Sequence, residues 1–246
     1  MIGKCKLCQE NRKLLKSHII PEWAYESMYD EKHRIFQISS DTERGKTDKF
    51  KGEYEHLLCQ ECESSTAKWD DYARAVILSK PGEKTYGILT SATNGAIQVE
   101  NVDYTLFKLF QLSILWRASA SKRDFFEKVN LGLHENKIRE MLLSEDPGKP
   151  DHYGCVMVAF MKNPRKLLHE MITRPESFHA NGHRWYKFLF VGCGWMYVVS
   201  SHEKRFEHKK LFLHPNEPLI IPLCPMHDAK WITDYLGLIH KKLFGF

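Results

Sequence analysis

The chain has 246 residues, of which 43% are hydrophobic and 27% charged, a composition typical of a soluble globular protein with one large or two small domains. This composition excludes a disordered chain, a collagen and a coiled coil, and no apolar stretch reaches the roughly 18 residues of a membrane span. The net charge of +5 is uneven, because residues 1–103 carry 15 Lys and Arg against 17 Asp and Glu, whereas residues 104–246 carry 21 against 14. We therefore expect an anionic partner, DNA or RNA, along the second half, although a solvated basic surface explains the charge equally well.

The start of the chain lacks the apolar core of a signal peptide, so we expect a cytoplasmic protein. Seven cysteines, an odd number, argue against a disulfide framework.

The first part of the chain predicts short elements around two cysteine pairs. The β-branched run His18 to Ile20 favours a strand, and Pro21 is well placed to start a helical turn over residues 22–28. A second strand is predicted over residues 34–39, and the polar residues 40–56 favour a loop or an irregular hairpin. A helix is expected from Glu63 to about Ser79, and Asn94-Gly95 favours a hairpin turn.

The second part predicts a buried helix over residues 104–119, because its apolar positions are nearly continuous. The remaining elements expected there are helices at 122–129, 134–143 and 226–243, and strands at 153–160, 185–200 (split by Gly192 and Gly194) and 218–223.

The two cysteine pairs are the most informative feature of the sequence. Cys5-x2-Cys8 and Cys59-x2-Cys62 have the spacing with which two tight turns direct four sulfurs at one zinc ion. The 50 residues between the pairs exceed the length typical of a compact zinc ribbon, but an inserted hairpin accounts for the gap. A zinc ion held by four thiolates has no open position, so we expect this ion to be structural.

The other three cysteines show no pair spacing and are interpreted as packing residues. They are Cys155, Cys193 and Cys224, and the sequence Cys224-Pro-Met-His227 leaves a second metal site as an alternative for the last of them.

The order of these motifs resembles the HNH (ββα-metal, treble-clef) endonuclease superfamily in its zinc-stapled form. Its zinc-stapled members have a first Cys pair, an Asp-His-Ile-x-Pro strand and a second Cys pair that leads into a helix; here Ser17-His18-Ile19-Ile20-Pro21 lies between the pairs. The chain is also similar to uncharacterised bacterial proteins with Ser-His-Ile-Ile-Pro and Leu-Leu-Cys-x2-Cys-Glu. The resemblance covers about residues 1–80, so we expect an α+β protein in which a zinc-stapled module (1–80) precedes a mixed helix and antiparallel-sheet domain (81–246).

The resemblance implies that His18 is the general base and that a divalent ion, Mg²⁺ or Mn²⁺, stabilises the transition state of phosphodiester hydrolysis. Two positions depart from the family: Ser17 replaces its metal-binding Asp, and Glu63 follows Cys62 where members often have His. Glu63 and Asp70, seven residues apart on one helical face, are candidates for the missing oxygen ligands.

Each of these residues also has a structural explanation. His18 fits a core histidine, Glu63 suits the first turn of a helix dipole, and Asp70 with Arg74 forms a common i,i+4 pair.

Two features of the second half are candidates for substrate recognition. Arg117, Lys122 and Arg123 place three cations near the end of the buried helix, where phosphate contacts and dipole partners both occur. The run Trp185-Tyr186-Lys187-Phe188 suits base stacking, although strand alternation makes two of the rings core residues.

The sequence thus favours an HNH-like metal-dependent nuclease with a structural zinc ion. The alternative, which Ser17 favours, is a non-catalytic zinc-binding module that recognises nucleic acid or protein.

Overall fold

The computed structural model describes residues 1–38, 46–50, 52–78, 92–93, 95–163, 166–200, 209–230 and 232, and the side chains of these except 36–38, 46–50 and 92–93. The strands are β1 (Ile2–Lys4), β2 (Asn11–His18), β3 (Arg34–Ile38), β4 (Lys46–Phe50), β5 (Tyr54–Cys59), β6 (Ala92–Thr93), β7 (Ala96–Val99), β8 (Cys155–Asn163), β9 (Lys166–Leu167), β10 (Thr173–Ala180), β11 (His183–Phe190), β12 (Cys193–Val199) and β13 (Leu219–Pro225). The helices are α1 (Gln60–Leu78), α2 (Tyr104–Ala120) and α3 (Leu133–Leu143), with 3-10 turns η1 (Glu22–Met28), η2 (Asp124–Phe126), η3 (Lys209–Leu211) and η4 (Met226–Asp228).

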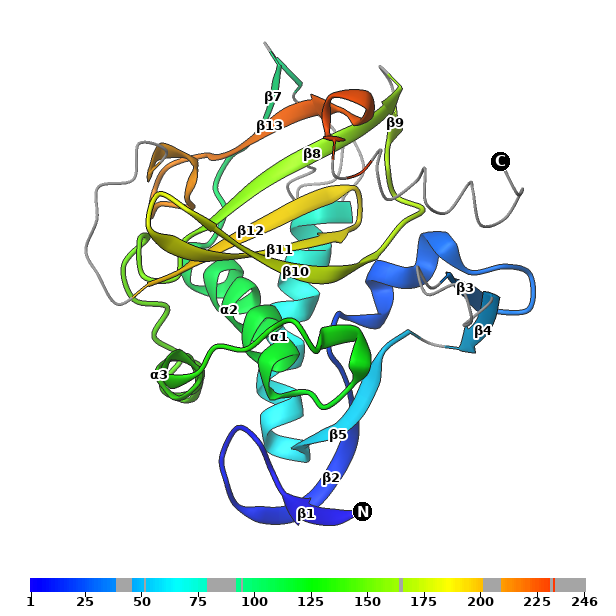
Figure 1. Ribbon diagram of the computed structural model, residues 1–246. Helices are drawn as coiled ribbons and strands as arrows, with labels where there is room; N and C mark the ends of the chain where they lie inside the picture. The colour runs from blue at the N-terminus through cyan, green and yellow to red at the C-terminus, as the bar shows by residue number, and fades with distance from the viewer. Residues whose placement is uncertain are drawn as a thin grey trace.

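Three sheets organise these strands. An antiparallel sheet of order β1-β2-β5 lies at one end of the molecule, and an eight-stranded sheet of order β10-β11-β12-β8-β13-β7-β6, with β9 against β8, lies at the other (Figure 1). Only the β8–β13 pair of the described strands is parallel. The third sheet is the hairpin β3–β4. Helices and antiparallel sheets therefore mix as the predicted α+β class requires.

Helix α1 connects the two ends of the fold. It begins directly after β5 in the small sheet and runs up beside α2 toward the large sheet (Figure 1). Its 19 residues span about 28 Å at 1.5 Å per residue. Trp69, Ala73 and Val76 recur at helical spacing and are fully buried.

Helix α2 lies in the centre of the core, which explains its nearly continuous apolar sequence. Almost every residue from Phe107 to Ala120 is buried, including Lys108, Gln111 and Arg117. The Lys108 ammonium donates to the carbonyls of Pro150 and Tyr153, at 3.3 and 2.9 Å, and burial lowers the pKa of Lys108 to about 8. The predicted helix over residues 104–119 is confirmed.

One hydrophobic cluster includes residues from both predicted segments, among them Ile19 and Trp69 from the first and Phe110 and Trp195 from the second. The predicted domain boundary near residue 80 lies outside the described residues, so the division into two domains stays a prediction. No helix in the described part of the chain combines the length and apolar character needed to cross a membrane.

Several predicted elements are confirmed with small shifts. Helix α3, β8 and β13 lie within a few residues of their predicted ranges, and β6 and β7 form the expected hairpin around Gly95. The strand-like run 185–200, predicted to be split by Gly192 and Gly194, is two strands, β11 and β12. Val191 and Gly192 both have positive φ and form a tight two-residue turn, whereas Gly194 lies within β12.

Other predicted elements are wrong. The predicted strand from His18 to Ile20 is wrong in its bounds, because β2 ends at His18. Ile19 and Ile20 follow the strand as fully buried residues, so these two β-branched side chains serve to fill the core. The predicted helix over residues 122–129 is reduced to the 3-10 turn η2. The Phe126 N–H bonds to the Arg123 carbonyl and the Val129 N–H to the Phe126 carbonyl, and both bonds span three residues, as in a 3-10 helix. For residues 40–56, predicted as a loop or an irregular hairpin, the hairpin alternative is confirmed at residues 46–50, which form β4 and pair with β3. Residues 54–56 belong to β5.

Strand β10 was not predicted, because its sequence is polar and contains Pro175. That proline lies at a break in the β10–β11 register, where a strand tolerates proline. The predicted final helix begins as the 3-10 turn η4, and most of its remaining residues lie outside the described part of the chain.

Candidate metal centre and the Ser17–Arg117 cluster

The four paired cysteines converge from three elements. Cys5 and Cys8 lie in the turn between β1 and β2, closed by hydrogen bonds from Cys5 N–H to Glu10 O and from Gln9 N–H to Cys5 O, both 2.9 Å. Cys59 ends β5, and Cys62 lies in the first turn of α1. The insertion of residues 19–53 between β2 and β5 explains the long sequence gap between the pairs.

The positions of the four sulfur atoms fit tetrahedral coordination of one ion. The four Sγ atoms lie within 4.8 Å of one another, and Cys8 Sγ is 3.9 Å from Cys59 Sγ. Four sulfurs at about 2.3 Å from a zinc ion would lie about 3.8 Å apart. Cys5, Cys59 and Cys62 are buried, so the site is shielded from solvent. These cysteines therefore form a cluster that can bind zinc.

The electrostatics of the cluster also suit a cation. Burial acts to raise the pKa of the Cys5 thiol, but backbone N–H groups of Cys8, Cys59 and Leu7 outweigh it and lower that pKa. The Cys59 N–H donates to Cys5 Sγ at 3.3 Å. Burial and the nearby Cys5 sulfur raise the pKa of Cys62. Four crowded sulfurs can all be thiolates only beside a positive charge, which a zinc ion supplies.

Helix α3 supports the first cysteine turn from outside. Arg139 Nη1 donates to the carbonyl of Leu7 at 3.1 Å, so a residue far along the chain fixes the turn between Cys5 and Cys8. This contact could not be predicted from the sequence, because Arg139 belongs to an ordinary amphipathic helix.

Beside the cysteines, β2 and α1 bring Ser17 and Glu63 together. Ser17 Oγ donates to Glu63 Oε2 at 2.5 Å and accepts from the Leu58 N–H at 3.2 Å. Ser17 is fully buried, whereas His18, the next residue on β2, is partly exposed. Burial raises the pKa of Glu63, and Ser17, Arg117 and His18 each act to lower it. The two positions at which the sequence departs from the HNH pattern are thus bonded to each other.

The buried Arg117 and the mostly buried Asp70, whose side chain is 16% exposed, form an ion pair next to this contact. Arg117 Nη2 lies 2.7 Å from Asp70 Oδ1 and Nη1 lies 3.0 Å from Oδ2, so both carboxylate oxygens are engaged. Arg117 Nη1 also donates to the His18 carbonyl at 2.9 Å. Burial raises the pKa of Asp70, and Arg117 acts to lower it. The predicted i,i+4 pair of Asp70 with Arg74 is wrong, because Arg74 contacts Glu26 at 3.1 Å.

The structure places the three candidate phosphate-binding cations in different settings. The Arg117 side chain is 1% exposed and bound to Asp70, which contradicts a role as a surface phosphate contact. Arg123 is half-exposed and forms an ion pair with the buried Glu53 at 3.1 Å. Lys122 is exposed, and its backbone N–H donates to Glu55 at 2.8 Å.

The remaining sequence candidates pack as ordinary residues. Cys155 and Cys193 are buried, and Cys224 is partly buried; among the described residues only the four paired cysteines form a cluster of metal-ligand type. In the aromatic run, Tyr186 and Phe188 are core residues, and Trp185 stacks on Phe178.

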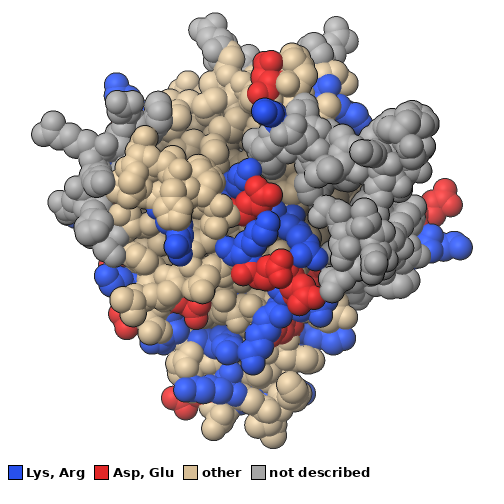
Figure 2. All heavy atoms as spheres, in the orientation of Figure 1, with Lys and Arg blue, Asp and Glu red and all other residues tan. Residues whose placement is uncertain are grey.

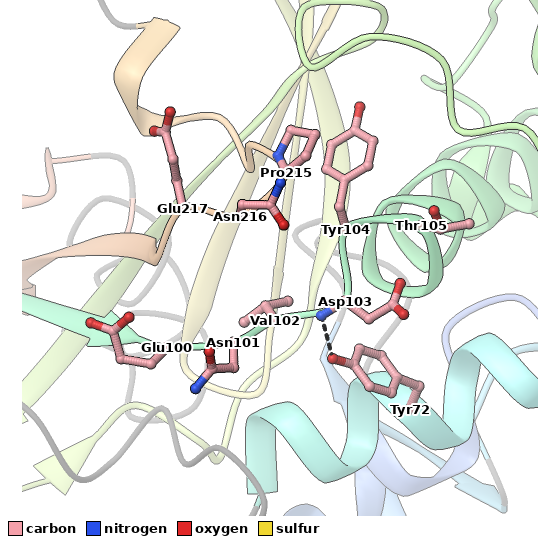
Figure 3. A pocket seen from close by; sticks show the side chains of 10 residues that line it. All are labelled: Tyr72, Glu100, Asn101, Val102, Asp103, Tyr104, Thr105, Pro215, Asn216 and Glu217. Atoms are coloured by element: carbon pink, nitrogen blue, oxygen red, sulfur yellow. Dashed lines mark hydrogen bonds between the residues drawn. The ribbon is translucent and has the colours of Figure 1, made fainter.

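A cavity of about 680 Å³, which sequence reasoning missed, lies away from the cysteines, at the far part of α1 (Figure 3). Three carboxylates line it, and the Asp103 N–H donates to Tyr72 Oη at 2.6 Å. Its lining residues are Tyr72, Glu100, Asn101, Val102, Asp103, Tyr104, Thr105, Pro215, Asn216 and Glu217. None of the predicted site residues lies in it.

The chain matches no protein-family model, no curated protein and no solved structure, so the resemblance to the HNH superfamily is carried by its sequence motifs alone.

Proposed function

We propose that this protein is a zinc-stapled ββα module that recognises nucleic acid and does not hydrolyse it. The observation that carries the proposal is that the positions expected to hold a second metal ion are satisfied within the protein. Glu63 accepts a hydrogen bond from Ser17, and Asp70 uses both carboxylate oxygens on Arg117. One carboxylate with a serine hydroxyl is a poor donor set for Mg²⁺ or Mn²⁺, which prefer several oxygen ligands.

The nucleic-acid partner is supported by the charge of the small sheet. Residues 1–18 contain five Lys and Arg and one Glu. Lys and Arg side chains gather on the lower part of the molecular face in Figure 2, where β1, β2 and β5 lie in Figure 1, with few acidic side chains among them. In the centre of that face basic and acidic side chains alternate. A local excess of cations attracts the phosphate backbone.

The second candidate function is an HNH-like nuclease, favoured by the position of His18. This residue ends β2, is partly exposed, and exerts an electrostatic effect on Glu63. In that function the His18 ring would accept the proton of an attacking water molecule, and Arg117 would hold the His18 backbone in place.

The two functions are separated by His18→Ala. We expect the zinc-loaded wild-type protein to bind a fluorescent oligonucleotide with an affinity that falls as salt rises, and His18→Ala to retain this salt-dependent binding. Neither protein should cleave plasmid, single-stranded DNA or RNA with Mg²⁺ or Mn²⁺. Fluorescence anisotropy and gel electrophoresis measure the two activities.

His152→Ala, which changes an exposed histidine on the loop after α3, is the matched control. Cleavage by wild type and His152→Ala that is lost in His18→Ala would establish the nuclease. Absence of nucleic-acid binding at low salt would overturn the recognition function.

A further inference from the structure

The outer face of the β2–β5 pair carries cations and rings next to His18. Lys16 pairs with His56 and His18 pairs with Tyr54, so these four side chains lie on one face of the sheet. Lys16 and His56 are exposed, and His18 and Tyr54 are partly exposed. Ser17, between Lys16 and His18, is buried on the opposite face. We name this set of four residues the hairpin face.

The acidic residues of the same strands do not cancel this charge. Glu55 pairs with Ser17 and therefore points to the opposite face, where its carboxylate accepts from Ser121 Oγ and Lys122 N–H, both at 2.8 Å. Farther along β2, Arg12 is paired with Glu61 at 2.7 Å. The Lys16 ammonium thus remains the cation of the hairpin face itself.

The aromatic ring of the face is already used to hold a cation. The Lys16 ammonium lies 5.1 Å from the centroid of the Tyr54 ring, and the His18 ring meets Tyr54 edge-on at 5.9 Å. A tyrosine beside a lysine on an open strand offers a flat ring for a base and a positive charge for the adjoining phosphate. Within a duplex, base faces are covered by their neighbours, so only an unpaired strand offers a base to the ring.

We propose that the hairpin face binds single-stranded nucleic acid, with Tyr54 stacking on one base and Lys16 contacting a neighbouring phosphate. The proposal rests on the nucleic-acid recognition proposed above and names the substrate class of that surface. Binding moves the Lys16 ammonium from the Tyr54 ring to the phosphate, so the two side chains act together.

The test measures binding of a labelled oligonucleotide of about 12 nucleotides, and of the corresponding duplex, to the zinc-loaded full chain without Mg²⁺. We expect the single strand to bind about ten-fold more tightly than the duplex. Tyr54→Leu should weaken single-strand binding about ten-fold, whereas Tyr54→Phe, which keeps the ring, should stay near wild type. Lys16→Gln should flatten the slope of log affinity against log salt by about 0.7.

Lys149→Gln is the matched control for Lys16→Gln. Lys149 lies away from the hairpin face. Its neighbour Pro150 contacts Lys108, which is about 13 Å along α2 from Arg117, the residue that contacts His18. This exposed lysine should leave the salt slope unchanged. Zinc content and the thermal midpoint show that each variant folds.

The outcomes separate this inference from the proposed function. Equal binding of single strand and duplex, or unchanged affinity in Tyr54→Leu, would overturn the stacking inference and leave nucleic-acid recognition standing. No binding of either nucleic acid at low salt would overturn both.

Discussion

Arg117 shows how one buried cation joins distant parts of the chain. Its guanidinium bonds to Asp70 of α1, to the His18 carbonyl at the end of β2 and to Ser113 of its own helix. Surface salt bridges contribute little to stability, but a buried carboxylate left without its partner is costly. The pair therefore holds α1, α2 and β2 in one arrangement.

Replacing Arg117 should reveal this cost. We expect Arg117→Met to lower the free energy of unfolding by about 3 kcal/mol, because the mostly buried Asp70 carboxylate is left without its partner, beside an apolar side chain. The double variant Arg117→Met/Asp70→Leu should recover much of the loss. Urea denaturation of the two single variants and the double variant measures the coupling.

The matched control is Arg74→Met, which removes the half-exposed pair with Glu26 and should cost less than about 1 kcal/mol. Equal losses in Arg117→Met and Arg74→Met would show that the buried pair has no special stabilising role.

At the scale of elements, the cysteine turns fix where β1, β2, β5 and α1 meet. One sulfur pair comes from the β1–β2 turn and the other from the β5–α1 junction, so an ion at their centre binds the two together. Because a structural zinc ion binds to the folded state, its binding free energy adds to the stability of these elements.

Cys8→Ser is expected to lose most of the bound zinc and to unfold at a lower temperature than wild type. Cys224→Ser, which changes a cysteine outside the cluster, should keep one zinc per chain. Metal analysis of the purified proteins with thermal denaturation checks both. One zinc per chain in Cys8→Ser, or its loss in Cys224→Ser, would contradict a four-cysteine site.

The success of sequence reasoning differs between kinds of element. The cysteine spacing and the buried helix α2 were predictable, because each depends on residues that are local in the chain. The partners of Asp70 were not, because an i,i+4 neighbour, Arg74, competed with Arg117, which is 47 residues away. The burial of Arg117 could have been predicted from the sequence, because a helix that is apolar on all sides buries its polar residues as well.

At the scale of the whole molecule, one hydrophobic core joins the small sheet, the helices and the large sheet. The cluster runs from Cys5 and Leu14 through Trp69 and Phe110 to Trp195. Because this cluster contains residues of both predicted segments, neither segment is expected to unfold separately.

We therefore expect a single unfolding transition in urea. Tryptophan fluorescence, which reports on both segments, far-UV circular dichroism and zinc release to a coloured chelator should have the same midpoint. Two separated transitions would instead support the division into residues 1–80 and 81–246.

The length of α1 has a consequence for the carboxylate-lined cavity. Cys62 lies in the first turn of this helix, and Tyr72, about 15 Å further along it, forms part of the cavity wall. Because one helix joins the two places, we expect an ion bound by the cysteines to restrain the start of the same helix whose later part forms a wall of this cavity.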